Sequence, residues 1–532
     1  MWELLLTDYP DPQRAAVLVD GIRNGVNVQY DGPLRNESIE SNNFSVAYEF
    51  PHDITDSIAN DCRSGTKAGP FTSPPFNPFT VSPLFTVPKK NTHKRRLIHD
   101  LSFPRGASVN TGIDNPDVSL ASFDRGVELV QAAGRHSFMC KIDIEAAYRQ
   151  IPVRPQDFHL LGMKWKGLYY FDKCLPFGLS SSCAIFEWFS SAAEWAVKHH
   201  SRNMIKWLTH YIDDFFLVAS TRPQAERQLE FLLIVFRLLG IPISKDKLEG
   251  PLQVLVFLGI EIDTILMEAR LPANKLIELV STVKLWLNKN QTTRKELESL
   301  IGVLSFACKV VRSGRTFLRR LIDTASSVSS PHVPIAISSD SPLRLDLLWW
   351  DQFLLCWNGS SLLLPRRSRH ATFQLHTDAC NTGYGAVLKR HGIASPRWLA
   401  SAWSPSQLEA AYRTSRLSMP YLEMLAVVIA LSSWASRIAN SRVALHCDCQ
   451  PVVNALRPHR YTSPDPYIMS CIRTILFVTA QHNIQLIITH IAGVDNALAD
   501  SLSRAQFDLF RQRCPGAQSS ADTPSPPPAH SW

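Results

Sequence analysis

The stretch "THYIDDFFLVAS" (residues 209–220) places two consecutive aspartates, Asp213 and Asp214, inside a run of apolar and aromatic residues. Burying a carboxylate is costly unless it is paired or bound to a cation, and two adjacent carboxylates also repel each other. Strand-forming residues on both sides predict a β-hairpin with the two aspartates at its turn and their side chains on opposite sides. The fold of this chain must therefore supply positive charge at this hairpin.

A third acid lies in a similar setting 70 residues earlier. In "SFMCKIDIEAAYRQIPV" an apolar run from Phe138 to Ile142 delivers Asp143 at the end of an expected strand. Carboxylates from neighbouring strand ends can hold two divalent metals roughly 4 Å apart, which activate an attacking oxygen and stabilise the leaving one. Taken alone, Asp213–Asp214 also fits an acidic surface turn, and Asp143 fits a helix N-cap better than a metal ligand. Together the three acids predict a magnesium site.

Length and composition place the chain among globular proteins of several domains. It has 532 residues, 45% of them hydrophobic and 19% charged, which predicts three or four domains or subdomains. The eleven cysteines form no CxxC pair, so we expect reduced, intracellular thiols. The N-terminus lacks the basic region of a signal peptide, and no apolar run is long enough to span a membrane.

Basic residues gather in two places, and the net charge is +8. One cluster is "VPKKNTHKRRLIHD" (87–100), and the other runs from Lys289 to Arg320. Such clusters are typical of a surface that binds a polyanion, although a solvated basic face fits them as well.

The hydrophobic pattern divides the chain into segments. Short strand-like and helical runs alternate from 97 to 263, and a helical region follows from 272 to 325. Thr292 or Thr293 is expected to cap the second of its helices, with Glu296 in the first turn. A second α/β pattern runs from Thr372 to about Arg504, and the Pro/Ser-rich tail after it is expected to be disordered.

Five motifs in the first of these α/β regions resemble those of reverse transcriptases. They are "SPLFTVPKKNTHKRRLIHDLS", "KIDIEAAYRQIPV", "CLPFGLSSSCAIFEW", "YIDD" and "VFLGIEID", in the order that the family has them over about 180 residues. The resemblance implies a right-hand fold of fingers, palm and thumb that copies RNA or DNA into DNA. It also implies that Asp143, Asp213 and Asp214 hold the metal ions.

The same resemblance implies a nucleotide site. Lys89 and Arg96 would clamp the triphosphate, with Arg95 as a register alternative and attraction of the template backbone as a second interpretation. Tyr148 matches an aromatic gate against the ribose 2′-hydroxyl, or a core tyrosine. Phe177 and Gly178 would lie under the nucleotide and template, and Lys247 matches a lysine that protonates pyrophosphate, or a solvated loop lysine.

A second set of acids lies in the last third of the chain. Asp378 ends a strand-like run in "TFQLHTDACNTGYGAVL", Glu423 is the one acid of an apolar helix, Asp448 follows another strand, and Asp500 lies on a helix. A lone Glu on an apolar helix is costly without a counter-ion, and four such acids suit a two-metal nuclease. Each acid alone also fits a cap or a turn. Gly383 and Gly385 suit a tight turn between two strands.

Together these four acids resemble the Asp-Glu-Asp-Asp set of ribonuclease H. The resemblance covers about 130 residues and implies a mixed sheet with helices that cuts the RNA strand of an RNA–DNA hybrid. His490 matches a histidine that shuttles protons or releases product, or is a structural histidine. Cys447 and Cys449, which flank Asp448, are expected to be packing residues.

These observations predict a mixed α/β (α+β) protein, a right-hand polymerase followed by a ribonuclease H-like mixed-sheet domain. The resemblance is greatest to retrotransposon Pol proteins, DIRS-like first and gypsy-like next. It implies an enzyme that uses Mg²⁺, two ions per site, with Mn²⁺ as a substitute, and that binds an RNA template, a DNA primer, their hybrid and dNTPs. The rival interpretation is a catalytically silent nucleic-acid-binding remnant. The expected parts are an N-terminal extension (1–70), fingers and palm (71–265), a thumb (266–325), a connection (326–370), a nuclease domain (371–504) and a disordered tail (505–532).

Overall fold

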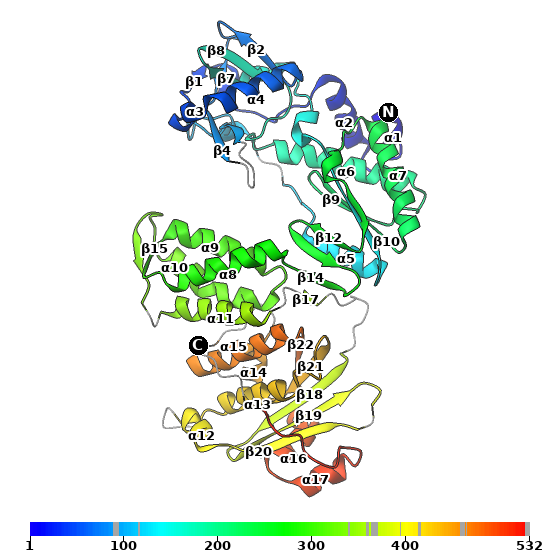
Figure 1. Cartoon of the computed structure of the whole chain (residues 1–532), viewed down its shortest axis with the longest axis vertical. Coiled ribbons are helices and arrows are strands. Elements are labelled where there is room, and N and C mark those ends of the chain that lie inside the picture. The colour runs from blue at the N-terminus through cyan, green and yellow to red at the C-terminus, as the bar shows by residue number, and fades with distance from the viewer. Residues whose placement is uncertain are drawn as a thin grey trace. The chain divides into compact units, whose positions relative to one another are not determined.

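The computed structural model divides into two compact units, Met1–Phe257 and Leu258–Trp532, whose elements are labelled in Figure 1. Both combine helices with sheets, as the mixed α/β pattern of the sequence predicts. The structure describes residues 1–526 except for 89–94, 115–116, 339–340, 358–360, 363–370, 394, 413–416, 458–462 and 464.

The centre of the first unit is a four-stranded antiparallel sheet in the order β11-β6-β10-β9, which we call the palm sheet. Its two inner strands are almost wholly apolar, because helices and strands cover both faces. In their register, Asp214 lies directly opposite both Asp143 and Tyr211. The strands are β11 (Glu249–Leu252), β6 (Phe138–Asp143), β10 (Asp214–Ala219) and β9 (Trp207–Tyr211).

Helices pack on both faces of the palm sheet. Phe215 of β10 meets Phe236 edge to face, with ring centroids 5.0 Å apart. Phe216, which points to the other face, stacks on Phe257 at 4.4 Å, and Gly126 lies against the Phe257 ring without room for a side chain. Phe236 belongs to α7 (Arg222–Leu239), Gly126 to α5 (Phe123–Ala133) and Phe257 to a strand, and α6 (Ser182–His200) packs against β9.

The first residues of the chain belong to the same core. Helices α1 (Trp2–Leu5) and α2 (Pro12–Asn24) contribute buried side chains to the cluster that contains Phe215 and Phe236. The indole Nε1 of Trp2 donates a hydrogen bond to the Leu239 carbonyl at 2.8 Å. The first half of the segment expected as an N-terminal extension (1–70), up to Leu34, is therefore part of the core behind the palm sheet, and its second half joins the sheet described next.

A second sheet, the fingers sheet, has the order β1-β3-β7-β8-β2. Strands β4 and β5, which follow β3 in the sequence, form a separate two-stranded antiparallel sheet. Lys67 and Asp172 are register partners on β2 and β8, and Val87 and Arg96 are partners on β4 and β5. The elements are β1 (Ile39–Glu40), β2 (Lys67–Phe71), β3 (Thr80–Val81), β4 (Leu84–Pro88), β5 (Arg95–His99), β7 (Gly162–Trp165), β8 (Leu168–Asp172), α3 (Ser45–Glu49) and α4 (Pro51–Arg63).

The second unit begins with strands and then a group of helices. The predicted cap is confirmed at Thr293, whose hydroxyl accepts from the Glu296 amide at 3.3 Å while Glu296 accepts from the Thr293 amide at 3.1 Å. This reciprocal capping box satisfies two amides that the helix leaves unpaired. The elements are β12 (Val254–Phe257) at the end of the first unit, then β13 (Ile260–Asp263), β14 (Glu268–Arg270), α8 (Ala273–Leu287), α9 (Arg294–Ala307), α10 (Arg319–Ser326) and α11 (Pro342–Cys356).

The rest of the second unit is built on a mixed five-stranded sheet, the nuclease sheet, in the order β20-β19-β18-β21-β22. The first three strands pair antiparallel, and β18, β21 and β22 pair parallel. The elements are β18 (Phe373–Ala379), β19 (Gly383–Arg390), β20 (Arg397–Ala402), α13 (Met419–Trp434), β21 (Arg442–Cys447), α14 (Gln450–Ala455), α15 (Pro466–Gln481), β22 (Gln485–His490) and α16 (Ala497–Ser503).

The two glycines expected at a turn lie within β19 instead. A Cβ on Gly385 would be 2.4 Å from the Cβ of Leu502, and one on Gly383 would be 3.1 Å from the Ser503 carbonyl oxygen. Both glycines therefore let α16 pack directly on the strand. Glycine is needed here for close packing, and not for a turn as the sequence suggested.

The segment after Arg504, expected to be disordered, is ordered as far as the structure describes it. Helix α17 (Phe507–Arg513) buries Phe510 against the nuclease sheet. The chain then runs along β20, where the Gln518 amide donates to the Pro396 carbonyl at 3.0 Å and the Asp522 amide to the Trp398 carbonyl at 2.8 Å. The Asp522 carboxylate also pairs with Arg397 and accepts from the Trp434 indole at 2.8 Å.

Two absences expected from the sequence can be compared with the structure. None of the eleven cysteines, all of which the structure describes, forms a disulfide. No helix among the described residues is long and apolar enough to cross a membrane.

Candidate active sites

The three acids of the first unit meet at one end of the palm sheet. β6 ends at Asp143, β10 begins at Asp214, and Asp213 lies in the turn between β9 and β10. Ile212 takes a φ of +56° in this turn, and the Asp213 carbonyl accepts from the Ile144 amide at 3.1 Å. The predicted hairpin is confirmed, and it brings the three carboxylates together.

The surroundings of Asp213 and Asp214 make their ionised forms unfavourable. Burial raises the pKa of Asp213, and the nearby Asp143 carboxylate raises it further. Burial, followed by Asp213 and Asp143, raises the pKa of Asp214 to about 6. A bound cation would relieve both effects, because it replaces lost hydration and offsets the repulsion between carboxylates.

Lys247 already brings positive charge to this cluster. Its Nζ lies 2.9 Å from both carboxylate oxygens of Asp143, and this hydrogen bonding raises the pKa of Lys247. The ammonium group stands where a cation bound by Asp143 would lie. Because more than half of the Lys247 side chain is exposed, it can leave without disturbing the core.

A cavity of about 560 Å³ opens beside the carboxylates. Asp143, Asp213 and Lys247 line it, as do Arg95 and Arg96. Arg95 is held by Thr86, whose hydroxyl and carbonyl oxygens accept from its guanidinium at 2.8 and 3.0 Å, whereas Arg96 lies over the Phe177 ring at 5.8 Å. Both candidate arginines therefore face the cavity, and Lys89 lies outside the described residues.

The three remaining nucleotide-site candidates lie together. Phe177 lines the cavity, and its ring centroid is 5.2 Å from that of Tyr148, which also packs on Phe186 at 5.5 Å. Gly178 has a φ of +110°, and a Cβ there would lie 2.2 Å from the His99 carbonyl oxygen. Only glycine fits this position, where two segments approach closely.

A buried histidine on β9 lies just before the aspartate turn. His210 stacks on Phe215 at 5.1 Å, and its Nδ1 and Nε2 face Glu194 at 2.5 Å and Glu187 at 2.9 Å, both on α6. Burial alone would lower the pKa of His210, but the two carboxylates raise it to about 9. An imidazolium therefore holds α6 to the strand that leads into the turn of Asp213 and Asp214. The sequence offered no signal for it beyond a lone polar residue in an apolar strand.

Two of the four acids of the second unit lie at strand ends, and the other two lie on helices. Asp378 is the penultimate residue of β18, Asp448 directly follows β21, and Glu423 and Asp500 project from α13 and α16. Among the described residues, ligand atoms of Glu423, Cys447 and Asp448 lie within 4.8 Å of one another. Cys447 is completely buried.

Two of these four acids, Glu423 and Asp378, have a raised pKa. Burial, followed by Asp378 and Asp448, raises the pKa of Glu423 to about 9, and its Oε2 is buried without a hydrogen-bond partner. Burial raises the pKa of Asp378 to about 6 against a hydrogen bond from Ser503, and Asp448 and Asp500 contribute in the same direction. Such a cluster suits a divalent cation, which supplies the missing counter-charge.

The remaining contacts orient the acids. Asn496, which the sequence analysis missed, is buried and donates from Nδ2 to Asp448 Oδ1 at 3.2 Å and to the Thr377 carbonyl at 2.9 Å. The His490 Nε2 lies 3.1 Å from the Asp448 carbonyl oxygen, and Asp500 accepts from Arg504 at 2.7 Å. No local pattern singles out Asn496 or Ser503, which orients Asp378, because Asn and Ser are common at helix ends and turns.

Comparison with known families agrees with both halves of this description. Residues 87–262 match the family model described as reverse transcriptase (RNA-dependent DNA polymerase). Residues 368–466 match the model described as RNase H-like domain found in reverse transcriptase. The chain carries a reverse transcriptase domain and a ribonuclease H-like domain. The second match includes Asp378, Glu423 and Asp448 and ends before Asp500.

The reverse transcriptase and ribonuclease H-like domains are related to those of retrotransposon and pararetrovirus Pol polyproteins. The chain is 21% identical over 83% of its length to Polyprotein P3 of Commelina yellow mottle virus, and 21% over 80% to the enzymatic polyprotein of Figwort mosaic virus. It is 21% identical over 88% of its length to the Pol polyprotein from transposon gypsy of Drosophila melanogaster. It spans 21%, 58% and 42% of these relatives' lengths.

A solved structure shares this fold. The foamy viral protease-reverse transcriptase in complex with double-stranded DNA matches 92% of this chain and 81% of its own, at 16% identity and a TM-score of 0.50. The expected fold class, a right-hand polymerase followed by a ribonuclease H-like mixed sheet, is confirmed.

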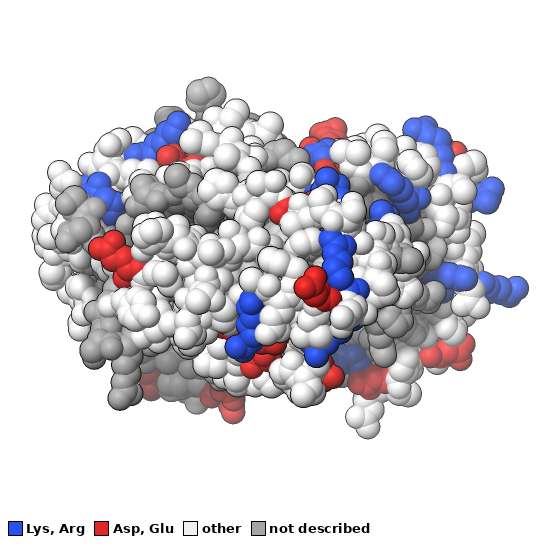
Figure 2. All heavy atoms as spheres, turned by 90° about the horizontal axis from the view of Figure 1, so that it is seen from below, with Lys and Arg blue, Asp and Glu red and all other residues white. Residues whose placement is uncertain are grey.

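Several basic residues of the second predicted cluster, Lys289 to Arg320, already pair with acidic side chains. Figure 2 shows one face of the molecule, on which Lys and Arg side chains lie singly or in small groups among uncharged and acidic ones. Within the second unit, four basic residues of the predicted cluster form ion pairs: Lys289 with Glu296, Arg294 with Glu298, Arg319 with Asp323 and Arg320 with Asp346.

Proposed function

We propose that this chain is an RNA-directed DNA polymerase that also degrades the RNA strand of the RNA–DNA hybrid it makes. The observation that carries the proposal is the presence of two separate carboxylate clusters, one in each of the two domains. In both, burial and neighbouring carboxylates raise the pKa of an acid in the cluster, Asp214 at the start of β10 and Glu423 on α13. Acids held in this way favour bound cations over an empty site.

The residues present fit Mg²⁺ at both sites. The candidate ligands are carboxylate oxygens, which Mg²⁺ prefers, and Lys247 supplies a cation against Asp143. The partnerless Oε2 of Glu423 points to the same need in the ribonuclease H-like domain. When bound, a pair of ions supplies activation of the attacking oxygen and stabilisation of the leaving oxygen. Mn²⁺ is an alternative ion with the same preference for oxygen.

In the polymerase site, Asp143 and Asp213 would hold the ions, with Asp214 more peripheral. Arg96 or Arg95, together with Lys89, would bind the triphosphate of a dNTP, and Phe177 and Gly178 would lie beneath the nucleotide and template. Tyr148 would exclude the ribose 2′-hydroxyl. Lys247 would leave Asp143 and protonate the departing pyrophosphate, a role that its exposed side chain permits.

In the nuclease site, Asp378, Glu423, Asp448 and Asp500 would hold the ions. Asn496 keeps the Asp448 carboxylate in one orientation, and Ser503 does the same for Asp378. Arg504 would release Asp500 when the ions and the hybrid bind, because the pair is solvent-exposed and weak. His490, which is exposed next to Asp448, would shuttle protons or assist release of the product.

The substrates follow from this assignment. They are an RNA template, a DNA primer, dNTPs and the RNA–DNA hybrid, and the two activities would serve a retroelement. We favour a DIRS-like element over a gypsy-like one, on the segments "RRLIHDLSFPRGASVN" and "ALADSLSR". The alternative is a silent nucleic-acid-binding remnant, against which the retention of all seven acids argues.

The test is Mg²⁺-dependent extension of a DNA primer on a labelled RNA template, with Asp213→Asn and Asp448→Asn beside the unchanged chain. We expect the unchanged chain to extend the primer and cut the template. Each variant should lose one activity by at least about a hundredfold and keep the other. Binding of the hybrid without extension or cleavage in any divalent metal would favour the silent remnant.

A further inference from the structure

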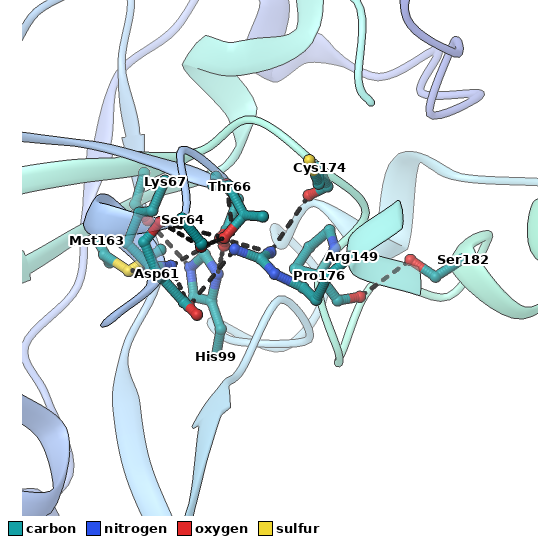
Figure 3. A network of polar contacts seen from close by, with 12 residues as sticks. Asp61, Ser64, Thr66, Lys67, His99, Arg149, Met163, Cys174, Pro176 and Ser182 are labelled. Atoms are coloured by element: carbon teal, nitrogen blue, oxygen red, sulfur yellow. Dashed lines mark hydrogen bonds and ion pairs between the residues drawn. The ribbon is translucent and has the colours of Figure 1, made fainter. Parts of the chain in front are cut away.

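Asp172 is a buried carboxylate at the wall of the polymerase cavity, and the proposed chemistry does not use it. It ends β8 of the fingers sheet. Its Oδ1 accepts from Lys67 Nζ at 2.6 Å and from Arg149 Nη1 at 2.7 Å, and its Oδ2 faces His99 Nδ1 at 3.2 Å. Figure 3 shows Lys67, His99 and Arg149 converging on one point.

The partners of Asp172 are fixed at their other ends too. Arg149 Nη2 donates to the Thr66 carbonyl at 3.1 Å and lies 3.4 Å from Asp61. The His99 Nε2 lies 3.1 Å from the Gly162 carbonyl oxygen. The network therefore joins α4, the fingers sheet and β5 to the segment that follows the strand of Asp143.

The charges in this network are balanced within it. Burial alone would raise the pKa of Asp172, but Lys67, Arg149 and His99 hold it far below its usual range. The Asp172 and Asp61 carboxylates offset the charges of Lys67 and Arg149, whose side chains are almost fully buried. These two cations are therefore poor candidates for contact with a triphosphate, and the network is better suited to holding structure.

The structure that it holds is strained. Ala146 and Ala147, in the turn between Asp143 and Tyr148, have φ values of +58° and +27°. L-residues rarely adopt such angles, and the strain persists only when the surroundings impose it. On one side the turn is fixed by the Ile144 amide, which donates to the Asp213 carbonyl at 3.1 Å. On the other side, directly after Tyr148, it is fixed by Arg149.

We propose that Asp172 and Arg149 are positioning residues, which hold this strained turn and so fix Tyr148 against Phe177 at the edge of the nucleotide cavity. Through that position they set the affinity for the incoming nucleotide and the preference for a deoxyribose over a ribose. Lys67 and His99 orient the Asp172 carboxylate toward Arg149. This role rests on the proposed polymerase function, because the cavity must bind nucleotides for it to matter.

Two variants and one matched control test the proposal on the full-length chain. Asp172→Asn removes the charge that Arg149 pairs with. Arg149→Lys keeps a cation but loses the planar group that reaches Thr66 and Asp61 as well as Asp172. This second variant tests the proposal if Asp172→Asn does not fold. The control is Asp157→Asn, because Asp157 is also fully buried between arginines, Arg35 at 2.9 Å and Arg154 at 2.8 Å, but is not part of the cavity wall.

The first measurement is the kinetics of single-nucleotide incorporation with a dNTP and with the matching rNTP. We expect KM for the dNTP to rise about tenfold in both variants with kcat within about threefold, because binding is lost while the carboxylates stay in place. The preference for dNTP over rNTP should fall by about tenfold. A purely structural loss would lower kcat through fewer folded molecules and leave KM and the preference unchanged, as we expect for Asp157→Asn.

The second measurement is hydrogen–deuterium exchange of the peptide that covers residues 144–150, which needs no activity. Faster exchange there in the two variants, but not in Asp157→Asn, supports the positioning role. Unchanged exchange together with unchanged KM in a folded variant overturns it. If the unchanged chain extends no primer, the polymerase function fails, while the exchange result still decides whether Asp172 and Arg149 hold the turn.

Discussion

Glu423 illustrates how a single residue can be unfavourable for folding and yet suited to hold a metal ion. It is 7% exposed on a helix that is otherwise apolar, and burial with two neighbouring aspartates raises its pKa to about 9. A carboxyl whose pKa is raised by folding destabilises the folded state at pH values above its unfolded pKa, which is 4.5 for Glu423. The cost is removed only by a proton or a cation.

We therefore expect Glu423→Gln to stabilise the metal-free chain at pH 7.5, by on the order of 2 kcal/mol, while it abolishes cleavage of the RNA strand. The measurement is thermal unfolding in EDTA, followed by a cleavage assay in Mg²⁺. Leu425→Met, a volume-conserving change two residues along the same helix, is the control and should leave both nearly unchanged. A lower melting temperature for Glu423→Gln would show that the carboxyl supports the fold.

The raised pKa of His210 stabilises the folded state, whereas that of Glu423 destabilises it. Its folded pKa of about 9 lies above its unfolded value of 6.5, so its contribution to stability is complete below pH 6.5 and is lost as the pH rises through 9. The groups that face it are Glu187 and Glu194, and Lys198 in turn contacts Glu194.

We expect the free energy of unfolding of the first unit to fall by up to about 3 kcal/mol between pH 6.5 and pH 9.5 because of this one residue. In His210→Gln that part of the pH dependence should disappear. Urea titrations at three pH values, followed by a signal from the first unit, measure the difference. An equal slope in the variant and in the unchanged chain would assign the pH dependence to other groups.

At the scale of elements, the sequence predicted features that depend on residues close together in the chain and missed those that depend on distant residues. The cap at Thr293 and the hairpin at Asp213 depend on residues that are adjacent in the chain, so pattern and turn chemistry predicted both. The pairing of Asp172 with Lys67, His99 and Arg149 joins segments up to 105 residues apart, and no local pattern marks it. The tail after Arg504 has a disordered composition, but contacts with the folded domain order its described part, 505–526.

The two candidate sites also contain residues that the sequence predicted and residues that it did not. Six of the seven acids were found because each ends a strongly apolar run or interrupts one, and Asp500 was found through the resemblance to the ribonuclease H set. Asn496 and Ser503, which orient two of them, escaped because Asn and Ser are common in short helices and caps for local reasons. Motif and periodicity locate charges in apolar surroundings, whereas neutral residues that hold those charges in place become visible only in the fold.

At the scale of the whole molecule, each unit has its own buried core. Phe236 is fully buried in the first unit and Phe510 in the second. We expect scanning calorimetry to resolve two unfolding transitions, and Phe236→Ala and Phe510→Ala each to destabilise one of them by about 3–5 kcal/mol, the usual cost of removing a buried ring. A single transition that both variants lower equally would show that the units unfold as one.

The course of the tail along β20 also bears on how fragments of this chain behave. β20 is an edge strand of the nuclease sheet, and the Asp522 amide bonds to the Trp398 carbonyl within it while the Gln518 amide bonds to the Pro396 carbonyl directly before it. A shortened chain that ends at Arg504 would leave that edge free to pair with a strand of another molecule. Precipitation of such a fragment would then report intermolecular sheet formation, and an intact nuclease fold could still lie within the aggregate.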